Sequence, residues 1–273
     1  MHTILNRKAV KQASLTVFVD GLQSRGRYTF TRPEALESLN STEVALTFAL
    51  NRLSKKGRIV AVKRGFYVIV PVEYTASKIL PTDWFLADLM KFLGQPYYAG
   101  LLTAAALHGA AHQQPQRFHV VTTKEQRPIE VKGLGIRFFK KAGTEKTLVQ
   151  QVKTPTGYIP VSTPGATAID LIAYQNRVGS WDRVATVLQE LVEVMDEDGL
   201  LAAAQAEKEL PSIQRLGWVL AKIGHESLTG KLAEWLHERQ PPTTPLDPSQ
   251  PRKGCPRDLR WNVIVNTEVE GEL

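Results

Sequence analysis

The chain has 273 residues, of which 43% are hydrophobic, and a formal net charge of +7; this length predicts about two domains, and this hydrophobic content is ample for buried cores. The longest mostly apolar run, residues 99–111, is too short to cross a bilayer, and the polar N-terminus predicts no signal peptide. The single cysteine, Cys255, excludes an internal disulfide framework and is typical of a reducing cytoplasm. We therefore expect a cytoplasmic protein with no membrane partner.

The positive charge is concentrated in the N-terminal quarter of the chain. Residues 1–70 contain 12 Lys or Arg and 4 Asp or Glu, a net charge of +8. Residues 71–273 contain 22 basic and 23 acidic residues, a net charge of −1. A small domain with concentrated positive charge is typical of proteins that bind the phosphate backbone, so this partition indicates DNA binding.

The elements expected in this quarter follow the order of a winged helix-turn-helix. A first helix is expected over residues 13–25, and Thr31 and Glu34 form the pattern of a capping box at the start of a short second helix. A longer helix is expected over residues 43–56, after a cap by Ser41 or Thr42 and before Gly57. Two β-rich runs, 58–63 and 66–70, then predict a hairpin with a basic turn. We expect residues 1–75 to form this domain.

The longer helix offers two faces. Ala45, Ala49 and Leu53, flanked by Leu46 and Phe48, are expected to face the core, and Glu43, Thr47, Asn51 and Lys55 recur at four-residue steps on a polar face. Taken alone, this face also fits an ordinary solvated helix, but with the charge distribution it favours base and phosphate contacts. The residues that we expect to contact DNA are Arg32, Ser41, Thr42, Thr47, Asn51, Arg52, Lys55, Lys56, Lys63 and Arg64.

Residues 76–273 predict a second, larger domain of mixed type, so the chain as a whole is expected to be α+β. The expected helices lie at residues 82–93, 99–111, 164–174, 181–195, 200–210, 213–223 and 228–236. The expected strands lie at residues 117–123, 129–131, 136–140, 157–161 and 260–266, the last after a proline-rich linker or strap at 241–256.

Motifs for catalysis or metal binding are incomplete. His108 and His112 are four residues apart, but Gly109 stands where a zinc protease needs glutamate. Residues 224–231 resemble a phosphate-binding loop with the wrong spacing. Glu130 and Lys132 would point to one side of a strand, as in restriction-type nucleases, but no aspartate precedes them from residue 89 onward. We therefore expect no catalytic residue, no metal site and no cofactor.

Five segments in a fixed order carry a family resemblance. They are the wing end KRGFY at 63–67, YYAGLLTAAALHG at 97–109, PVSTPGATAIDL at 160–171, QRLGWVL at 214–220 and RWNVIVN at 260–266. Together the chain resembles the AbiE-type (AbiEi) antitoxins of bacterial type IV toxin–antitoxin and abortive-infection systems, which act in phage defence. One departure is Gly165, where such proteins often carry an acidic residue.

The resemblance implies two activities. The winged helix-turn-helix would bind inverted repeats in the promoter of its own operon as a repressor, and the larger domain, 76–273, would counteract a cognate nucleotidyltransferase-like toxin without necessarily forming a stable complex. The residues alone support only the DNA-binding half. Two alternatives remain open: a magnesium-dependent DNA nuclease with Glu130 and Lys132 in its active site, and a one-component regulator whose second domain binds a small ligand.

Overall fold

The structure is a computed structural model that describes residues 14–74, 80–110, 115–207 and 209–270. It divides into two compact units, each of which collects more than one segment of the chain. The first consists of residues 1–93, 129–134 and 154–157, and the second of 94–128, 135–153 and 158–273. The expected boundary at residues 75 and 76 falls in the segment 75–79, outside the described residues. The division at this boundary stays a prediction, and the first compact unit extends beyond it to Leu93.

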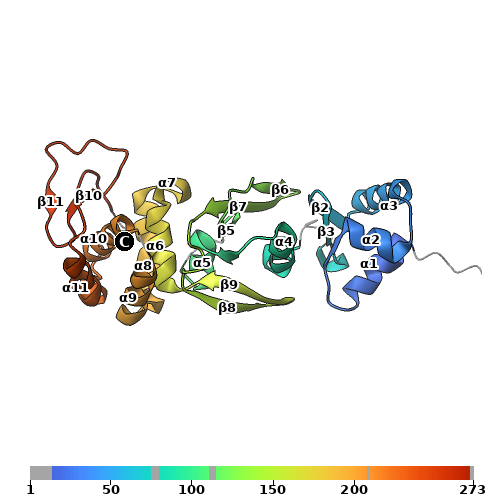
Figure 1. Ribbon diagram of the computed structural model, residues 1–273, viewed down its shortest axis with the longest axis horizontal. Helices are drawn as coiled ribbons and strands as arrows, with labels where there is room; N and C mark the ends of the chain where they lie inside the picture. The colour runs from blue at the N-terminus through green and yellow to red at the C-terminus, as the bar shows by residue number, and fades with distance from the viewer. Residues whose placement is uncertain (1–13, 75–79, 111–114, 208, 271–273) are drawn as a thin grey trace, which may run out of the picture. The chain divides into compact units, whose positions relative to one another are not determined.

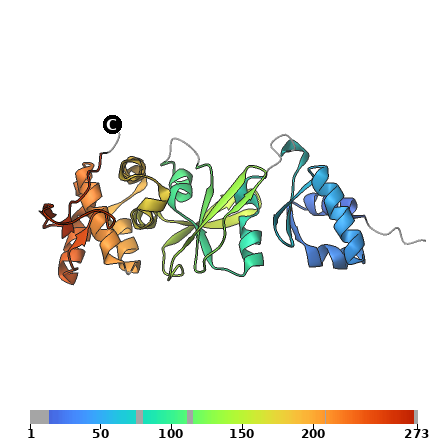
Figure 2. The ribbon, with the colours of Figure 1, turned by 90° about the horizontal axis from the view of Figure 1, so that it is seen from above.

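Over residues 14–70, the first unit forms three α-helices and a three-stranded antiparallel sheet in the order β1-β3-β2 (Figure 1). The elements are α1 (Leu15–Gln23), β1 (Thr29–Thr31), α2 (Arg32–Leu39), α3 (Glu43–Lys55), β2 (Ile59–Lys63) and β3 (Phe66–Ile69). Figures 1 and 2 both show the helices together beside the sheet. The winged helix-turn-helix is therefore present, and its third strand, β1, is one that we did not expect from the sequence.

Local capping determines where these helices begin. The Ser14 hydroxyl accepts a hydrogen bond at the start of α1, and Thr42 caps α3 in the same way. At α2, Thr31 and Glu34 form the complete capping box that the sequence predicts. Asn40 then ends α2 in the left-handed conformation, which turns the chain toward α3.

The first unit also contains the residues that follow the hairpin. They form the 3₁₀ turns η1 (Val72–Tyr74) and η2 (Thr82–Trp84), the helix α4 (Leu86–Leu93) and the strand β6 (Ile129–Val131). The ring of Phe92 lies 5.3 Å from that of Phe66, and Trp84 lies edge-on to Tyr28 at 5.1 Å. A hydrogen bond also joins Thr29 to Asp88. These contacts explain why α4 groups with the winged helix.

The second unit is built on a mixed sheet with helices on it. Its strands run in the order β7-β5-β4-β9-β8, with β4 antiparallel to β5, and with the pairs β5–β7 and β4–β9 parallel. The strands are β4 (Tyr97–Ala99), β5 (Phe118–Thr122), β7 (Leu134–Lys140), β8 (Val149–Thr154) and β9 (Gly157–Ser162). The helices are α5 (Leu101–Leu107), α6 (Pro164–Ala173), α7 (Gln175–Val178), α8 (Trp181–Leu191), α9 (Glu197–Ala206), α10 (Leu210–Lys222) and α11 (Gly230–Arg239), with 3₁₀ turns η3 (Val192–Val194) and η4 (Glu226–Thr229).

The proline-rich strap closes the second unit over α10. In the structure the strap extends to Ile264, and the name is used below for residues 241–264. It forms a small sheet of two-residue strands, β10 (Thr244–Pro245), β11 (Arg257–Asp258) and β12 (Val263–Ile264), in the order β10-β12-β11. The amide of Gln214 donates to the backbone carbonyls of Pro242, Trp261 and Asn262 at 3.1–3.2 Å. The expected strand at 260–266 is confirmed only at β12, and the carbonyls of Trp261 and Asn262 instead accept from Gln214. The α+β class that the sequence predicts is confirmed.

Candidate nucleic-acid interface

The helix α3 buries a face that matches the predicted one only in part. Its buried residues are Leu46, Leu50 and Leu53, whereas Ala45 and Phe48 are exposed. Of the residues expected at the core, Leu46 and Leu53 are buried and Ala49 packs against the core, whereas the expectation was wrong for Ala45 and Phe48. Both patterns keep helical spacing, and the larger leucines form the core because they remove more apolar surface from water than alanine does.

The change of core face moves the exposed face as well. At about 100° of rotation per residue, the side chains opposite the leucines are those of Val44, Phe48, Asn51 and Lys55. All four are exposed. Thr47 also is exposed, but it lies to one side of this face, on the same side as Glu43. A helix that docks in a groove presents the face opposite its core, so this face would meet DNA first.

Arg32 links the hairpin turn to the start of α3. Its backbone N–H donates to the Gly65 carbonyl at 2.9 Å. Its guanidinium donates to Glu43 Oε2 at 2.5 and 2.9 Å and to the hydroxyl of Thr47 at 2.7 Å. The hydrogen bond that Arg32 donates to Glu43 is the main reason why the pKa of Arg32 is raised. The pair neutralises the carboxylate that would otherwise repel phosphate, and it brings the hairpin turn close to α3.

The hairpin turn is tight and basic. Lys63 pairs with Phe66 across it, which leaves Arg64 and Gly65 as the two connecting residues. Gly65 has a φ of 85°, in the region that side chains disfavour, so glycine suits this position. Arg64 is exposed, and Lys63 is half-buried.

The remaining predicted contacts fall into two groups. Thr42 accepts a hydrogen bond from the Ala45 N–H at 3.2 Å, so its hydroxyl is engaged in capping, and the nearby Ser41 hydroxyl makes only a 3.4 Å contact with the Thr42 carbonyl. The second group makes no side-chain hydrogen bond within the part of the chain that the structure describes. Its members are Asn51, Arg52, Lys55, Lys56, Lys63 and Arg64. Available donors therefore gather on α3 and at the hairpin turn.

Other basic residues of this unit are held by carboxylates. Arg27 pairs with Glu34 at 2.5 Å, and Arg58 pairs with Asp20 at 2.7 Å. These pairs brace the winged helix rather than offer charge to a ligand. The positive charge of the N-terminal quarter is thus distributed unevenly between structural pairs and an exposed set.

The pair proposed for a nuclease does not share a strand face. Glu130 lies in β6, but β6 ends at Val131, and Lys132 lies in the following turn with a φ of 50°. His108 Nε2 lies 2.7 Å from the Ser162 carbonyl, and His112 is outside the described residues. Over residues 14–74, 80–110, 115–207 and 209–270, no three His, Cys, Asp or Glu side chains gather at one point as a metal site would require. In the same ranges, no helix has the length and apolar character that a membrane span needs.

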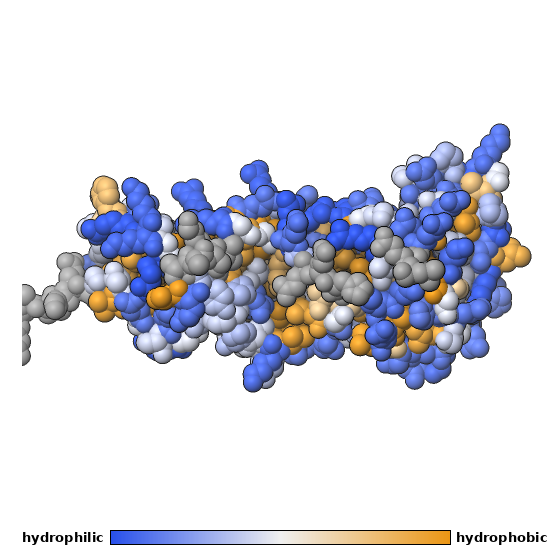
Figure 3. Space-filling model, turned by 180° about the vertical axis from the view of Figure 1, so that it is seen from behind, coloured by the Kyte–Doolittle hydropathy of each residue, from blue (hydrophilic) through white to orange (hydrophobic). Residues whose placement is uncertain are grey.

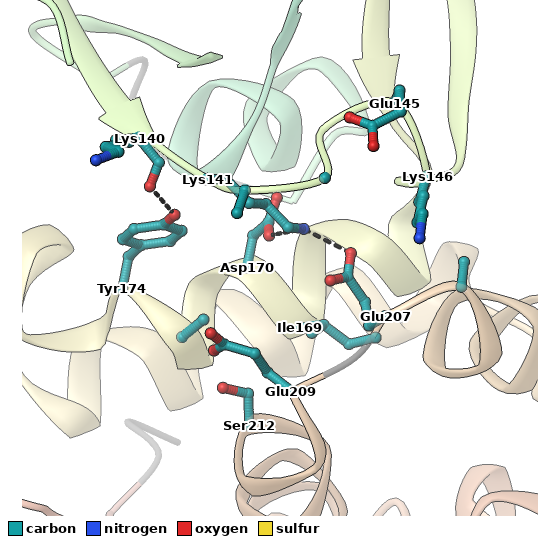
Figure 4. Close-up of a pocket in the computed structure, with 14 residues that line it drawn as sticks. Lys140, Lys141, Glu145, Lys146, Ile169, Asp170, Tyr174, Glu207, Glu209 and Ser212 are labelled. Carbon is teal, nitrogen blue, oxygen red and sulfur yellow. Dashed lines mark hydrogen bonds and ion pairs between the residues drawn. The ribbon is translucent and has the colours of Figure 1, made fainter. Parts of the chain in front are cut away.

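The second unit contains a buried ionic cluster that the sequence did not predict (Figure 4). Asp170 of α6 is fully buried and accepts from the Tyr98 hydroxyl at 2.7 Å and from Lys141 Nζ at 2.8 Å. Lys141 Nζ also donates to Glu207 at 2.5 Å. Burial lowers the pKa of Lys141, but the two carboxylates outweigh it and raise the pKa above its usual value. Lys141 therefore stays charged, and it joins the end of β7 to α6 and to Glu207 at the end of α9.

A cavity of about 560 Å³ opens beside this cluster. Its rim carries both charges, with Lys140 and Lys146 against Glu145 and Glu209 (Figure 4). Tyr98 and Asp170 both belong to segments that carry the family resemblance, so the segments YYAGLLTAAALHG and PVSTPGATAIDL meet at this cluster. These two family segments are therefore the sequence feature from which the Tyr98–Asp170 part of the cluster could have been inferred. The partners Lys141 and Glu207 carried no such feature.

Comparison with known proteins gives matches over both units. A family model described as "Transcriptional regulator, AbiEi antitoxin" matches residues 19–70, and one described as "AbiEi antitoxin C-terminal domain" matches residues 98–222. The crystal structure of the RV2827C protein from Mycobacterium tuberculosis is similar at a TM-score of 0.62 and 14% identity, over 90% of this chain and 89% of that chain. At this identity the likeness concerns the fold. No protein with a curated description matches.

Proposed function

The chain belongs to the AbiEi antitoxin family, and we propose that it represses transcription of its own operon and counteracts a cognate nucleotidyltransferase-like toxin. The winged helix would bind inverted repeats in promoter DNA, with one copy of the domain on each half-site. The observation that carries the proposal is the set of available donors on α3 and at the hairpin turn. Membership of this family of antitoxins and transcriptional regulators follows from the two family matches.

The proposed contacts divide by chemistry. Lys63 and Arg64 would neutralise phosphates from the turn, and Arg52, Lys55 and Lys56 would do so from the C-terminal half of α3. Asn51 would read a base edge, because its amide both donates and accepts and matches the N6 and N7 atoms of adenine. Arg32 would act by holding Glu43 and the turn in place.

The first test concerns the hairpin turn. Arg64→Ala and Lys63→Ala in the full chain are each expected to weaken binding to every duplex and to reduce the slope of log affinity against log salt by about 1. Fluorescence anisotropy with labelled duplexes at several salt concentrations measures both quantities.

Lys222→Ala is the matched control, because this exposed lysine lies on α10 in the second unit. It should leave the slope unchanged. Salt-independent binding by the unsubstituted chain, or equal slopes for all variants, contradicts the proposed interface.

The nuclease alternative is tested by a double substitution. Glu130→Ala combined with Lys132→Ala is expected to leave protection against the co-expressed toxin intact, because the two side chains do not share a face. Growth of cells that carry an inducible toxin measures protection, and thermal unfolding of the purified variant shows that it folds. Loss of protection by a folded double variant favours the nuclease, as does magnesium-dependent cleavage of plasmid DNA by the unsubstituted chain.

A further inference from the structure

Two large apolar side chains stand exposed on the face of α3 that lies opposite its core. Val44 is 66% exposed and Phe48 is 65% exposed. They are four residues apart, so they are neighbours along one line of the helix surface. Single exposed hydrophobic residues are ordinary on protein surfaces, and Figure 3 shows hydrophobic side chains among a mostly hydrophilic surface. The position of this pair, rather than its exposure alone, requires an explanation.

We propose that Val44 and Phe48 contact the C5-methyl groups of thymines in the major groove, so that they select A·T base pairs in the bound duplex. The proposal rests on the proposed function, since it assigns specificity to the same helix. The thymine methyl is the apolar group that the major-groove edges of the bases present, and phenylalanine is one of the side chains that contact it. Asn51, three residues after Phe48, would read adenine at a neighbouring position.

The surroundings of the pair favour DNA over a protein partner. Arg52 follows Phe48 by one turn, and Lys55 and Lys56 continue the exposed surface toward the C-terminus of α3. A stable protein interface buries about 800 Å² on each partner and is depleted in charged residues at its centre. Two apolar side chains that adjoin exposed cations match an apolar spot within a phosphate-lined groove better than such an interface.

The experiment uses the full chain and the duplex that it selects from a pool of random sequence. Each thymidine of this duplex is replaced in turn by 2′-deoxyuridine, which removes only the methyl group. Affinity is expected to fall about fourfold at each contacted thymine, since burial of one methyl group contributes this much. In Phe48→Ala, the duplexes with and without the methyl group at the contacted position should bind equally.

Val17→Ala is the matched control, because Val17 is 63% exposed but lies on α1. It should retain the full response to deoxyuridine. Phe48→Leu, which keeps an apolar side chain, should retain part of it, and circular dichroism should show that each variant is folded.

The outcomes separate this inference from the proposed function. If salt-dependent binding occurs but no deoxyuridine substitution weakens it, or if Phe48→Ala keeps the full response, the inference is wrong while the proposed function stands. If Phe48→Ala instead changes the sedimentation behaviour of the free chain and keeps the response, the pair is a contact between two copies. If the chain selects no duplex at all, the proposed function itself fails.

Discussion

Asp170→Ala is expected to lower the free energy of unfolding of the second unit by about 3–5 kcal/mol, because it removes one member of a buried ionic cluster. The carboxylate is fully buried, and its two oxygens accept from Tyr98 and Lys141. Without it, the Tyr98 hydroxyl loses its acceptor in the core, and Lys141 keeps only Glu207. A buried donor left unsatisfied costs its desolvation free energy in addition to the lost bond.

Urea unfolding followed by tryptophan fluorescence measures this change. Four of the five tryptophans, Trp181, Trp218, Trp235 and Trp261, lie in the second unit, so the signal reports mainly on it. Glu145→Ala is the control, since Glu145 lines the same cavity but is exposed. Its expected effect lies within about 0.5 kcal/mol. An equal and small loss for both variants would show that the cluster does not stabilise the unit.

The cluster also explains what the family segments encode in this chain. Tyr98 lies on β4, just before α5, and Asp170 lies on α6. The hydrogen bond between them joins residues 72 positions apart. These segments therefore specify packing at the centre of the second unit. A loss of toxin protection in Asp170→Ala would reflect this packing, and it is to be interpreted beside the unfolding measurement.

The sequence predicted the first unit well where the signals are local. The capping box of Thr31 and Glu34, the cap at Thr42 and the glycine of the hairpin turn each act within a few residues of the chain. The face of α3 was harder to predict, because Ala45, Ala49 and Leu53 and the observed Leu46, Leu50 and Leu53 both recur at helical intervals. Only packing against α1, α2 and the sheet distinguishes them.

The second unit shows the limit for long-range contacts. The strand β4 has three residues, too few for an alternating pattern, and β8 is exposed along most of its length, so neither had the hydrophobic signature of a buried strand. Lys141 and Glu207 are 66 residues apart, and nothing near either one indicates the other. The cluster depends on how the sheet and helices pack, which single-sequence patterns do not encode.

Gly217→Ala is expected to destabilise the second unit, although alanine is the better helix former. Gly217 lies inside α10 and faces Trp261 of the strap, which is buried. A β-carbon at Gly217 would overlap three atoms of the Trp261 six-membered ring. Alanine contributes about 1 kcal/mol over glycine within a helix. Overpacking of a core costs about 1–3 kcal/mol, and the severity of this overlap places the cost at the upper end, for a net loss of about 2 kcal/mol.

Gly21→Ala on α1 provides the control with the opposite sign. A β-carbon at Gly21 meets no atom within 4 Å, so the helix-forming preference acts alone and should stabilise the first unit by about 0.5–1 kcal/mol. Thermal unfolding of both variants, with fluorescence for the second unit and circular dichroism for the whole chain, measures the pair. Since Gln214 and Gly217 both lie in the segment QRLGWVL and both meet the strap, a stable Gly217→Ala would mean that the strap moves without cost and that this segment does not fix it.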